Sequence, residues 1–563
     1  MKTAPVLCAG LIMAAGIAAD FGRSAALSGP RNAGLKAPRY DSLRNGLDRK
    51  ADNFALLQLT QRPVSRRSGI GSAHDAVSTS VEEAQVFYDQ GLAYLHSYVW
   101  LEAARSFNQA LRLDKHLAMA EVGLTVAYTE LNVPVAAKDA MDRATALTPH
   151  VNDHERRHIN ARALQMAAEN APRDPARLTA YRSALDEALI KYPSDVELWL
   201  QRGQAESPDP AERGQGSVTG SMRFYQKAVA LAPSHFAGHH YLTHAYENTG
   251  RMTEALAEGT TYATMAPAVP HAHHMHGHEL RRLGRVAEAI AEFSAADALE
   301  SDYFKTEQIP VEYDWHYQHN LDLLATSYQY LGQMAKAEEL LKKSFAIPST
   351  LVEQEFNKRE WPVFLLARGR ARDALAAAGV LAAHQSPLVS ATGHIEIGRA
   401  HLALQEFQLA ADEANVALRL MKGAPEGAGL LATALQTLQG EYFLRTGPRD
   451  KGRATLEDVA KKVRAAPGPD AWTQALFTLD AIGRAAREVG DWEFAGRMAR
   501  EMLEHDPAYA GTHYALALVA EHAGDREATV AELRSAEKYW SQADADLAEL
   551  VDVRARLGRE GRR

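Results

Sequence analysis

Two histidine-rich segments of the chain repeat each other at a spacing of 34 residues. The matching positions are His239, His240 and His244 in the first segment and His273, His274 and His278 in the second. A fixed period of this length is typical of proteins built from repeated supersecondary units, in which each unit buries its apolar face against its neighbours. A chain of 563 residues is also too long for one compact core. The sequence therefore predicts a repeat architecture.

Small and large side chains recur at fixed positions in these units. The unit that begins near Ala84 supplies Gly91, Tyr94, Ala103, Phe107 and Ala110, and the unit from Ala118 supplies Leu124, Tyr128, Ala137, Met141 and Ala144. Small residues allow the two helices of a unit to approach closely, and large residues fill the space between units. The pattern resembles the tetratricopeptide repeat (TPR). The resemblance implies an all-α fold, a right-handed TPR-type helical solenoid of about ten helix–turn–helix units.

Composition divides the chain into five segments. Residues 1–19 resemble a secretory signal, because Lys2 precedes an apolar run that ends in small residues. The remaining segments are expected to be a mostly irregular linker over 20–83, an N-terminal TPR array with a histidine-rich groove over 84–348, a degenerate C-terminal TPR array over 349–545, and a solvated basic tail over 546–563.

A cleaved signal would place the protein in the bacterial periplasm or outside the cell, and otherwise the protein would be cytoplasmic. We expect no membrane span after removal of the signal. Cys8, the only cysteine, lies in the signal-like segment, so the mature chain is expected to form neither disulfides nor thiolate metal sites. The net charge of −9 argues against nucleic acid as a partner, and the sequence has no phosphate-binding loop that would indicate a nucleotide cofactor.

Helical geometry assigns the histidines to two faces, since successive residues lie about 100° apart around a helix. One stripe on the first helix of each unit points away from the packing side, and in TPR proteins this stripe lines the concave groove. The stripe comprises His240, His244 and Glu247 in the first unit, His271, His274 and His278 in the second, and His319 and Asp322 in a third. His239 and His273 fall on the packing side and are expected to be buried structural residues.

The composition of the stripe favours a metal site. Residues 235–319 hold 11 of the 23 histidines, whereas uniform scatter would put about three or four there. Two histidines at i and i+4 on one helix face reach a common ion, and packed helices lie close enough to share it. The expected ligands are His240, His244, His274, His278 and His319, with His271, Glu247 and Asp322 as further candidates. Nitrogen and oxygen ligands leave zinc, copper, iron, nickel and manganese open.

Other interpretations of the groove stay open. The histidines could bind a protein or peptide partner by stacking or hydrogen bonding, without an ion. They could also form the centre of a metal-dependent hydrolase or oxidoreductase that acts on a small-molecule substrate, with Glu247 and Asp322 as the candidate acid–base groups. An insertion at 304–317, which carries Trp315 and His316, separates the second unit from the third and could fold over the groove as a lid.

The motifs of the stripe resemble those of a group of bacterial TPR proteins. That group carries HYxxHA, HMxxH and HNL in this order, matched here by His240-Tyr241-x-x-His244-Ala245, His274-Met275-x-x-His278 and His319-Asn320-Leu321. The resemblance covers roughly residues 84–345. It implies that the histidines form one site, and it implies no particular reaction.

A rival motif, His154-Glu155-x-x-His158, matches the HExxH pattern of zinc peptidases. Two arginines lie inside it, and it falls in the first helical turn after Asn152, where solvent exposure is expected. We therefore expect no catalytic zinc at this motif.

Overall fold

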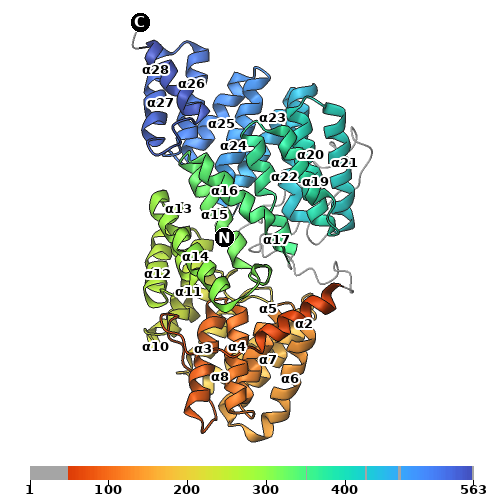
Figure 1. Cartoon of the computed structure of the whole chain (residues 1–563), viewed down its shortest axis with the longest axis vertical. Helices are drawn as coiled ribbons and strands as arrows, with labels where there is room; N and C mark the ends of the chain where they lie inside the picture. The colour runs from red at the N-terminus through yellow and green to blue at the C-terminus, as the bar shows by residue number, and fades with distance from the viewer. Residues whose placement is uncertain (1–47, 350–351, 425–427, 467–470, 561–563) are drawn as a thin grey trace, which may run out of the picture.

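All regular secondary structure in the described part of the chain is helical. The computed structural model describes residues 48–349, 352–424, 428–466 and 471–560, so the signal-like segment lies outside the described residues. Consecutive helices pack as antiparallel pairs, and the pairs follow one another along a curved solenoid (Figure 1). This arrangement confirms the predicted all-α, TPR-type fold. No helix within these ranges is long and apolar enough to cross a bilayer.

The first half of the solenoid forms the lower lobe in Figure 1. Its α-helices are α2 (Asp48–Thr60), α3 (Glu82–His96), α4 (Trp100–Leu113), α5 (Ala118–Glu130), α6 (Pro134–Leu147), α7 (Asp153–Glu169), α8 (Pro175–Lys191), α9 (Val196–Gln204), α10 (Thr219–Leu231), α11 (Phe236–Asn248), α12 (Met252–Met265), α13 (Pro270–Arg282) and α14 (Val286–Glu307). A short 3-10 helix, Thr148–His150, joins α6 to α7.

The second half forms the upper lobe. Its helices are α15 (His316–Tyr330), α16 (Met334–Ala346), α17 (Val352–Asn357), α18 (Glu360–Ala367), α19 (Ala371–Ala382), α20 (Pro387–Ala403), α21 (Phe407–Gly423), α22 (Ala428–Thr446), α23 (Arg449–Ala465), α24 (Ala471–Glu488), α25 (Trp492–His505), α26 (Ala510–Ala523), α27 (Arg526–Tyr539) and α28 (Ala548–Glu560).

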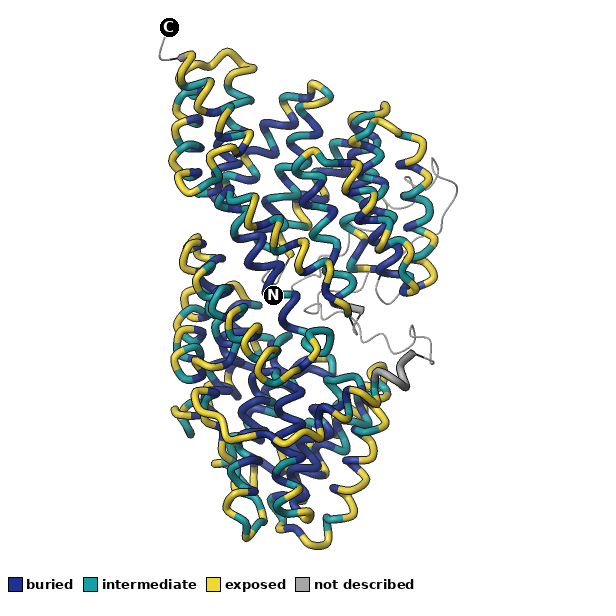
Figure 2. Tube along the Cα trace, in the orientation of Figure 1, coloured by how far each residue is buried: buried dark blue, intermediate teal, exposed yellow. Residues whose placement is uncertain are grey.

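Close helix packing depends on glycines, as the repeat pattern predicts. A Cβ atom at Gly91 on α3 or Gly123 on α5 would lie 2.5 or 2.4 Å from the ring of Phe107, which is fully buried on α4. Only a residue without a side chain allows this approach. Figure 2 shows the result along the whole solenoid, since the helix faces turned toward neighbours are buried and the outer faces are exposed.

The insertion closes the first half of the solenoid on itself. It begins within α14, continues through the 3-10 helix Val311–Tyr313, and ends in α15. The Tyr303 hydroxyl donates to Glu102 Oε1 (2.9 Å), and Arg105 Nη1 donates to Glu307 Oε2 (2.9 Å), so the end of α14 contacts α4. Ile309 is buried in the same place, in an apolar cluster with Leu56, Leu59, Leu101 and Val133. We call this closed first half the first solenoid turn.

The second half is closed by similar contacts. The Asp544 amide donates to the Gly332 carbonyl (3.1 Å), and the Ala335 amide donates to Asp544 Oδ2 (2.9 Å). The Tyr330 hydroxyl donates to Asp506 Oδ2 (2.8 Å). The segment after α27 and the loop before α26 therefore contact α15 and α16, where the second half begins.

Two segments that were expected to be irregular or solvated are packed. Residues 61–81 contain no helix or strand, but the Gly69 carbonyl accepts a hydrogen bond from the Ala268 amide (2.8 Å), which ties this segment to the solenoid. The basic tail forms α28, whose Leu550 and Val553 are buried against α27. The tail is thus a packed helix rather than a solvated end, because its apolar residues share one helix face.

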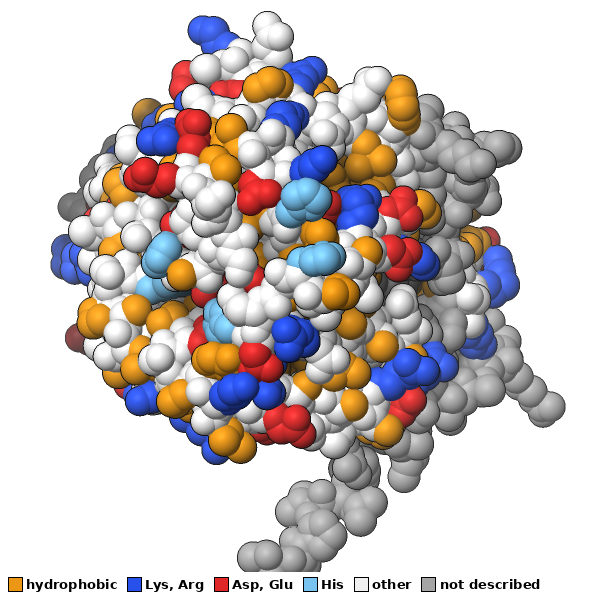
Figure 3. Space-filling view, turned by 90° about the horizontal axis from the view of Figure 1, so that it is seen from below, with side chains coloured by type: hydrophobic (Ala, Val, Ile, Leu, Met, Phe, Trp, Pro, Cys, Tyr) orange, Lys and Arg blue, Asp and Glu red, His pale blue; other side chains and the backbone are white. Residues whose placement is uncertain are grey.

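The outer surface carries charges of both signs. On the end of the molecule that Figure 3 shows, Lys and Arg are interspersed with Asp and Glu, and single histidines lie between them. The histidine triads described below lie inside the solenoid.

Substitution of Gly123 by alanine tests the packing. Gly123→Ala should lower the free energy of unfolding by about 1–3 kcal/mol, because the added methyl group must displace the buried Phe107 ring. Thermal unfolding followed by circular dichroism should show a lower midpoint. The matched control is Gly379→Ala on α19, where a Cβ atom meets nothing within 4 Å and the midpoint should stay or rise slightly. Equal midpoints for Gly123→Ala and the parent would contradict this account.

Candidate metal centre

The histidine stripe forms two triads, and in each the three imidazole nitrogens lie within 4.8 Å of one another. The first triad joins His240 and His244 on α11 to His271 at the start of α13. His240 Nε2 lies 3.1 Å from His244 Nε2 and 3.1 Å from His271 Nε2. A tetrahedral ion with bonds of about 2.0–2.1 Å to nitrogen separates its ligand atoms by about 3.3 Å. The three nitrogens therefore lie close to the positions that such an ion requires.

The hydrogen bond of His240 leaves its Nε2 available to an ion. The Nδ1 atom lies 2.6 Å from the backbone carbonyl of His96, and a carbonyl oxygen can only accept, so Nδ1 carries the proton. The lone pair of the neutral ring is then on Nε2. A metal-bound histidine commonly donates its other ring N–H to a carbonyl or carboxylate in this way.

The second triad has the same design. It joins His274 and His278 on α13 to His319 on α15. His274 Nδ1 lies 3.0 Å from Asn320 Oδ1, and Asn320 Nδ2 donates to the Phe293 carbonyl (2.9 Å). The second bond orients the amide so that its oxygen faces the imidazole, which makes Nδ1 the donor and leaves Nε2 of His274 for an ion.

Both triads use the same positions of the repeat. Each takes an i, i+4 pair from the first helix of one unit and a histidine from the first turn of the next unit's first helix. His271, expected only as a further candidate, is the repeat equivalent of His319 once the insertion is allowed for. The next pair in the series would be Asp322 and Thr326 on α15, so the histidine pattern ends there.

The two carboxylates of the stripe lie beside the triads rather than within them. Asp322 Oδ1 accepts a hydrogen bond from the Ser344 hydroxyl (2.7 Å). Glu247 Oε1 lies 3.6 Å from His278 Nδ1 and 3.5 Å from Arg282 Nη1. Burial raises the pKa of Glu247, but the interaction with His278 and the charge of Arg282 outweigh burial and lower this pKa to about 2. Glu247 is thus an ionised acceptor next to His278.

His316 belongs to the same cluster, although sequence reasoning placed it only in the insertion. It is buried at the start of α15, with ring centroids 5.0 Å from His271 and 4.3 Å from His274, between the two triads. Its Nδ1 is hydrogen-bonded to the buried Glu300, and its Nε2 has no hydrogen-bond partner among the described residues. The signal that could have found it is its position three residues before His319, on the same helix face.

Burial favours the neutral form of four of the clustered histidines. Desolvation lowers the pKa of His240, His271 and His274 well below 6.5, and neighbouring histidines add to the effect, because a second positive charge nearby is unfavourable. Burial likewise lowers the pKa of His316 to about 4. A neutral imidazole binds a metal ion without first losing a proton.

Aromatic side chains cover the first triad, so its histidines do not line an open groove, whereas His319 of the second triad is half-buried. The Tyr98 ring lies 4.8 Å from that of His240 and 5.0 Å from that of His271, measured between centroids. Trp315 of the insertion donates its indole N–H to the Tyr98 carbonyl (3.1 Å). Tyr98 has φ of 60° at an interhelical turn where the units of α11 and α13 have Gly250 and Gly284. This conformation costs a non-glycine residue about 1–2 kcal/mol.

His239 and His273, assigned to the packing side, are half-buried and make hydrogen bonds to glutamates. His239 Nδ1 lies 2.6 Å from Glu258 Oε2, and His273 Nδ1 lies 2.7 Å from Glu292 Oε2, on the second helix of each unit. The same pairing at a separation of 19 residues joins His394 to Glu413 and His513 to Glu532. These histidines hold helix pairs together and take no part in the triads.

Comparison with known proteins gives no family assignment. No family model and no curated protein matches the chain. Among solved structures, the apo form of the quorum sensor NprR from B. thuringiensis is similar, with a TM-score of 0.41 and 13% identity over 69% of this chain and 97% of that chain. The APC/C hetero-tetramer Cut9–Hcn1 is also similar, with a TM-score of 0.32 and 13% identity over 85% and 97%. On the basis of its own helix pairs and period, the chain is a TPR-like, all-helical repeat protein.

Proposed function

We propose that this protein is a TPR scaffold or binding protein whose two histidine triads each hold a transition-metal ion. The observation that carries the proposal is the geometry of the first triad. His240 Nε2 lies 3.1 Å from the Nε2 atoms of His244 and His271, and its Nδ1 is hydrogen-bonded to a backbone carbonyl. Imidazole ligands suit zinc, copper, iron and nickel, and the ligand type alone does not distinguish among these ions.

The ions would serve the scaffold as buried crosslinks between repeats. Each triad takes ligands from two successive units, so an ion bound there joins α11 to α13, or α13 to α15. Such an ion adds its binding free energy to the stability of the folded state. The outer faces of the helices then remain for a protein or peptide partner.

A metal-dependent hydrolase or oxidoreductase is a second candidate. Catalytic zinc sites supply three protein ligands and leave a fourth position for water or substrate, which is the number of ligands in each triad. Glu247 is an ionised acceptor beside the second triad, 3.6 Å from His278. In this case Tyr98 or Trp315 must move before a small-molecule substrate can reach an ion in the first triad, because these side chains cover His271.

Two further proposals rest on sequence alone. The motif resemblance supports membership of the bacterial TPR group described above, since its three motifs supply all members of the triads except His271. The signal-like residues 1–19 support a periplasmic or secreted location.

Adjacent histidines provide the test of metal binding. Protein reconstituted with zinc and dialysed should lose about one equivalent of metal in His240→Gln, because one of three ligands is removed. His239→Gln is the matched control, since the neighbouring residue pairs with Glu258 outside the triads and its loss should leave the metal content unchanged. Absence of any bound transition metal before and after reconstitution would refute both metal-dependent functions and leave a scaffold that binds partners without an ion.

The aromatic cover over the first triad should control the rate at which metal leaves that triad. Trp315→Ala removes the hydrogen bond to Tyr98 and part of the packing around it. This loss should lower the free energy of local opening by about 1.4 kcal/mol or more, so a chelator should remove metal about tenfold faster. Trp492→Ala is the control, because Trp492 lies in the second half and stacks on His522, away from the triads. Equal release rates for parent and Trp315→Ala would show that metal leaves by another route.

A further inference from the structure

A second group of ligand-type side chains lies at the start of α9, outside the triads. His154 Nε2 and His158 Nε2 on α7 lie 2.6 and 2.8 Å from Asp195 Oδ2. The expectation of a solvent-exposed HExxH motif was wrong here, since His158 is buried between α7 and α9. The glutamate of the motif is also buried, and Glu155 accepts a hydrogen bond from the Ser78 amide (2.5 Å). Asp195, remote in sequence, thus completes a set of two histidines and one carboxylate.

A second set of the same composition lies beside it. His96 Nε2 lies 3.0 Å from both oxygens of Glu197, and His235 Nε2 lies 3.1 Å from Glu197 Oε1. All three side chains are buried. The other ring nitrogen of His96 contacts the Tyr241 hydroxyl (2.8 Å), whereas Nδ1 of His235 is buried without a hydrogen-bond partner among the described residues. Internal hydrogen bonding therefore does not account for every polar atom of this set.

One helix N-terminus supplies both carboxylates. Asp195 is the N-cap of α9, where its Oδ1 accepts from the Leu198 amide (3.0 Å) and its Oδ2 faces the two histidines. Glu197 follows two residues later, in the first turn. The positive end of the helix dipole favours ionised carboxylates at these positions. Both carboxylates are thereby fixed before any ligand arrives.

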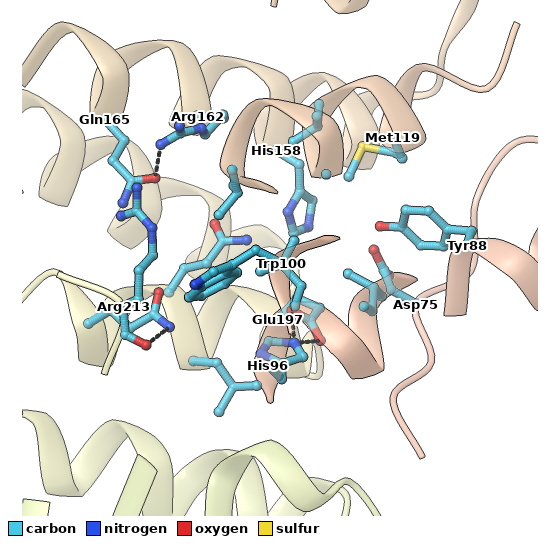
Figure 4. Close-up of a pocket in the computed structure, with 18 of the residues that line it drawn as sticks. Asp75, Tyr88, His96, Trp100, Met119, His158, Arg162, Gln165, Glu197 and Arg213 are labelled. Carbon is cyan, nitrogen blue, oxygen red and sulfur yellow. Dashed lines mark hydrogen bonds and ion pairs between the residues drawn. The ribbon is translucent and has the colours of Figure 1, made fainter. Parts of the chain in front are cut away.

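A cavity of about 80 Å³ adjoins the two sets. His96, His158 and Glu197 line one end together with Asp75, and Arg162, Gln165 and Arg213 line the other, as Figure 4 shows. A space of this size holds several water molecules. It therefore has room for water to complete the coordination of an ion bound to three protein ligands.

We propose a second metal centre beside this cavity, in which His154, His158 and Asp195 bind one divalent ion and His96, His235 and Glu197 bind another. Two histidines and one carboxylate with open positions are the ligand set of many zinc and non-haem iron(II) sites. The nitrogen–oxygen separations of 2.6–3.1 Å are about 0.2–0.7 Å below the ligand spacing of about 3.3 Å in a tetrahedral site. Small side-chain shifts would accommodate the ions, and His96, His158 and Glu197 are the ligands that line the cavity.

This centre shares no ligand with the triads, and zinc alone is the probe for it. Crystals of the full chain soaked in zinc should give anomalous difference peaks beside Asp195 and Glu197. Peaks at the triads only would overturn this proposal and leave the proposed function intact. Peaks beside α9 only would support this proposal and contradict metal binding at the triads. Because the unsubstituted chain is used, the result does not depend on whether any variant folds.

Variants give the second measurement. Asp195→Asn and Glu197→Gln should each reduce the zinc content by about one equivalent, because each removes the only carboxylate of its set. Asp186→Asn is the matched control, since Asp186 on α8 pairs with Arg202 and lies in neither set. Zinc content equal to that of the parent in both Asp195→Asn and Glu197→Gln, with circular dichroism unchanged, would show that these side chains form ion pairs only.

Discussion

Exclusion of water from the first solenoid turn decides the chemical state of the histidine cluster. An imidazolium loses most of its hydration when it is buried, so proton binding becomes unfavourable and the neutral ring persists. The contacts between the end of α14 and α4 close the turn, and Tyr98 and Trp315 complete the cover over His240 and His271. The same closure that removes water thus keeps the imidazoles in the protonation state that binds metal ions.

The repeat symmetry of the solenoid explains why one triad becomes two. In a solenoid each unit contacts mainly its neighbours, and every pair of neighbouring units packs in the same way. Three side chains that come together between two units therefore have equivalents, 34 residues further along the chain, that come together between the next two units. His240 and His274 are related in this way, and so are the structural histidines His239 and His273 on the packing side. The series stops at α15, where Asp322 bonds to Ser344 instead of joining a third triad.

Periodicity predicted the parts of the site that local geometry determines. Helix geometry places His239 and His240 on different faces of α11 and brings the i, i+4 pairs onto one face. The order of the units brings α11, α13 and α15 close together. The cover was not predictable in the same way, because Tyr98 reaches His240 from a turn more than 130 residues away in sequence. The centre at α9 was missed for the same reason, since no repeat spacing relates Asp195 to the histidines of α7.

His96 links the two groups of ligands. Its backbone carbonyl accepts the Nδ1–H of His240 and so determines which nitrogen of that ring faces the first triad. Its own imidazole lies 3.0 Å from Glu197, in the set at the start of α9. A shift of His96 on occupation of that set would move the carbonyl that orients His240, and the converse also holds, because coupling between two binding sites is reciprocal. The end of α3 is therefore a direct physical connection between the cavity and the triads.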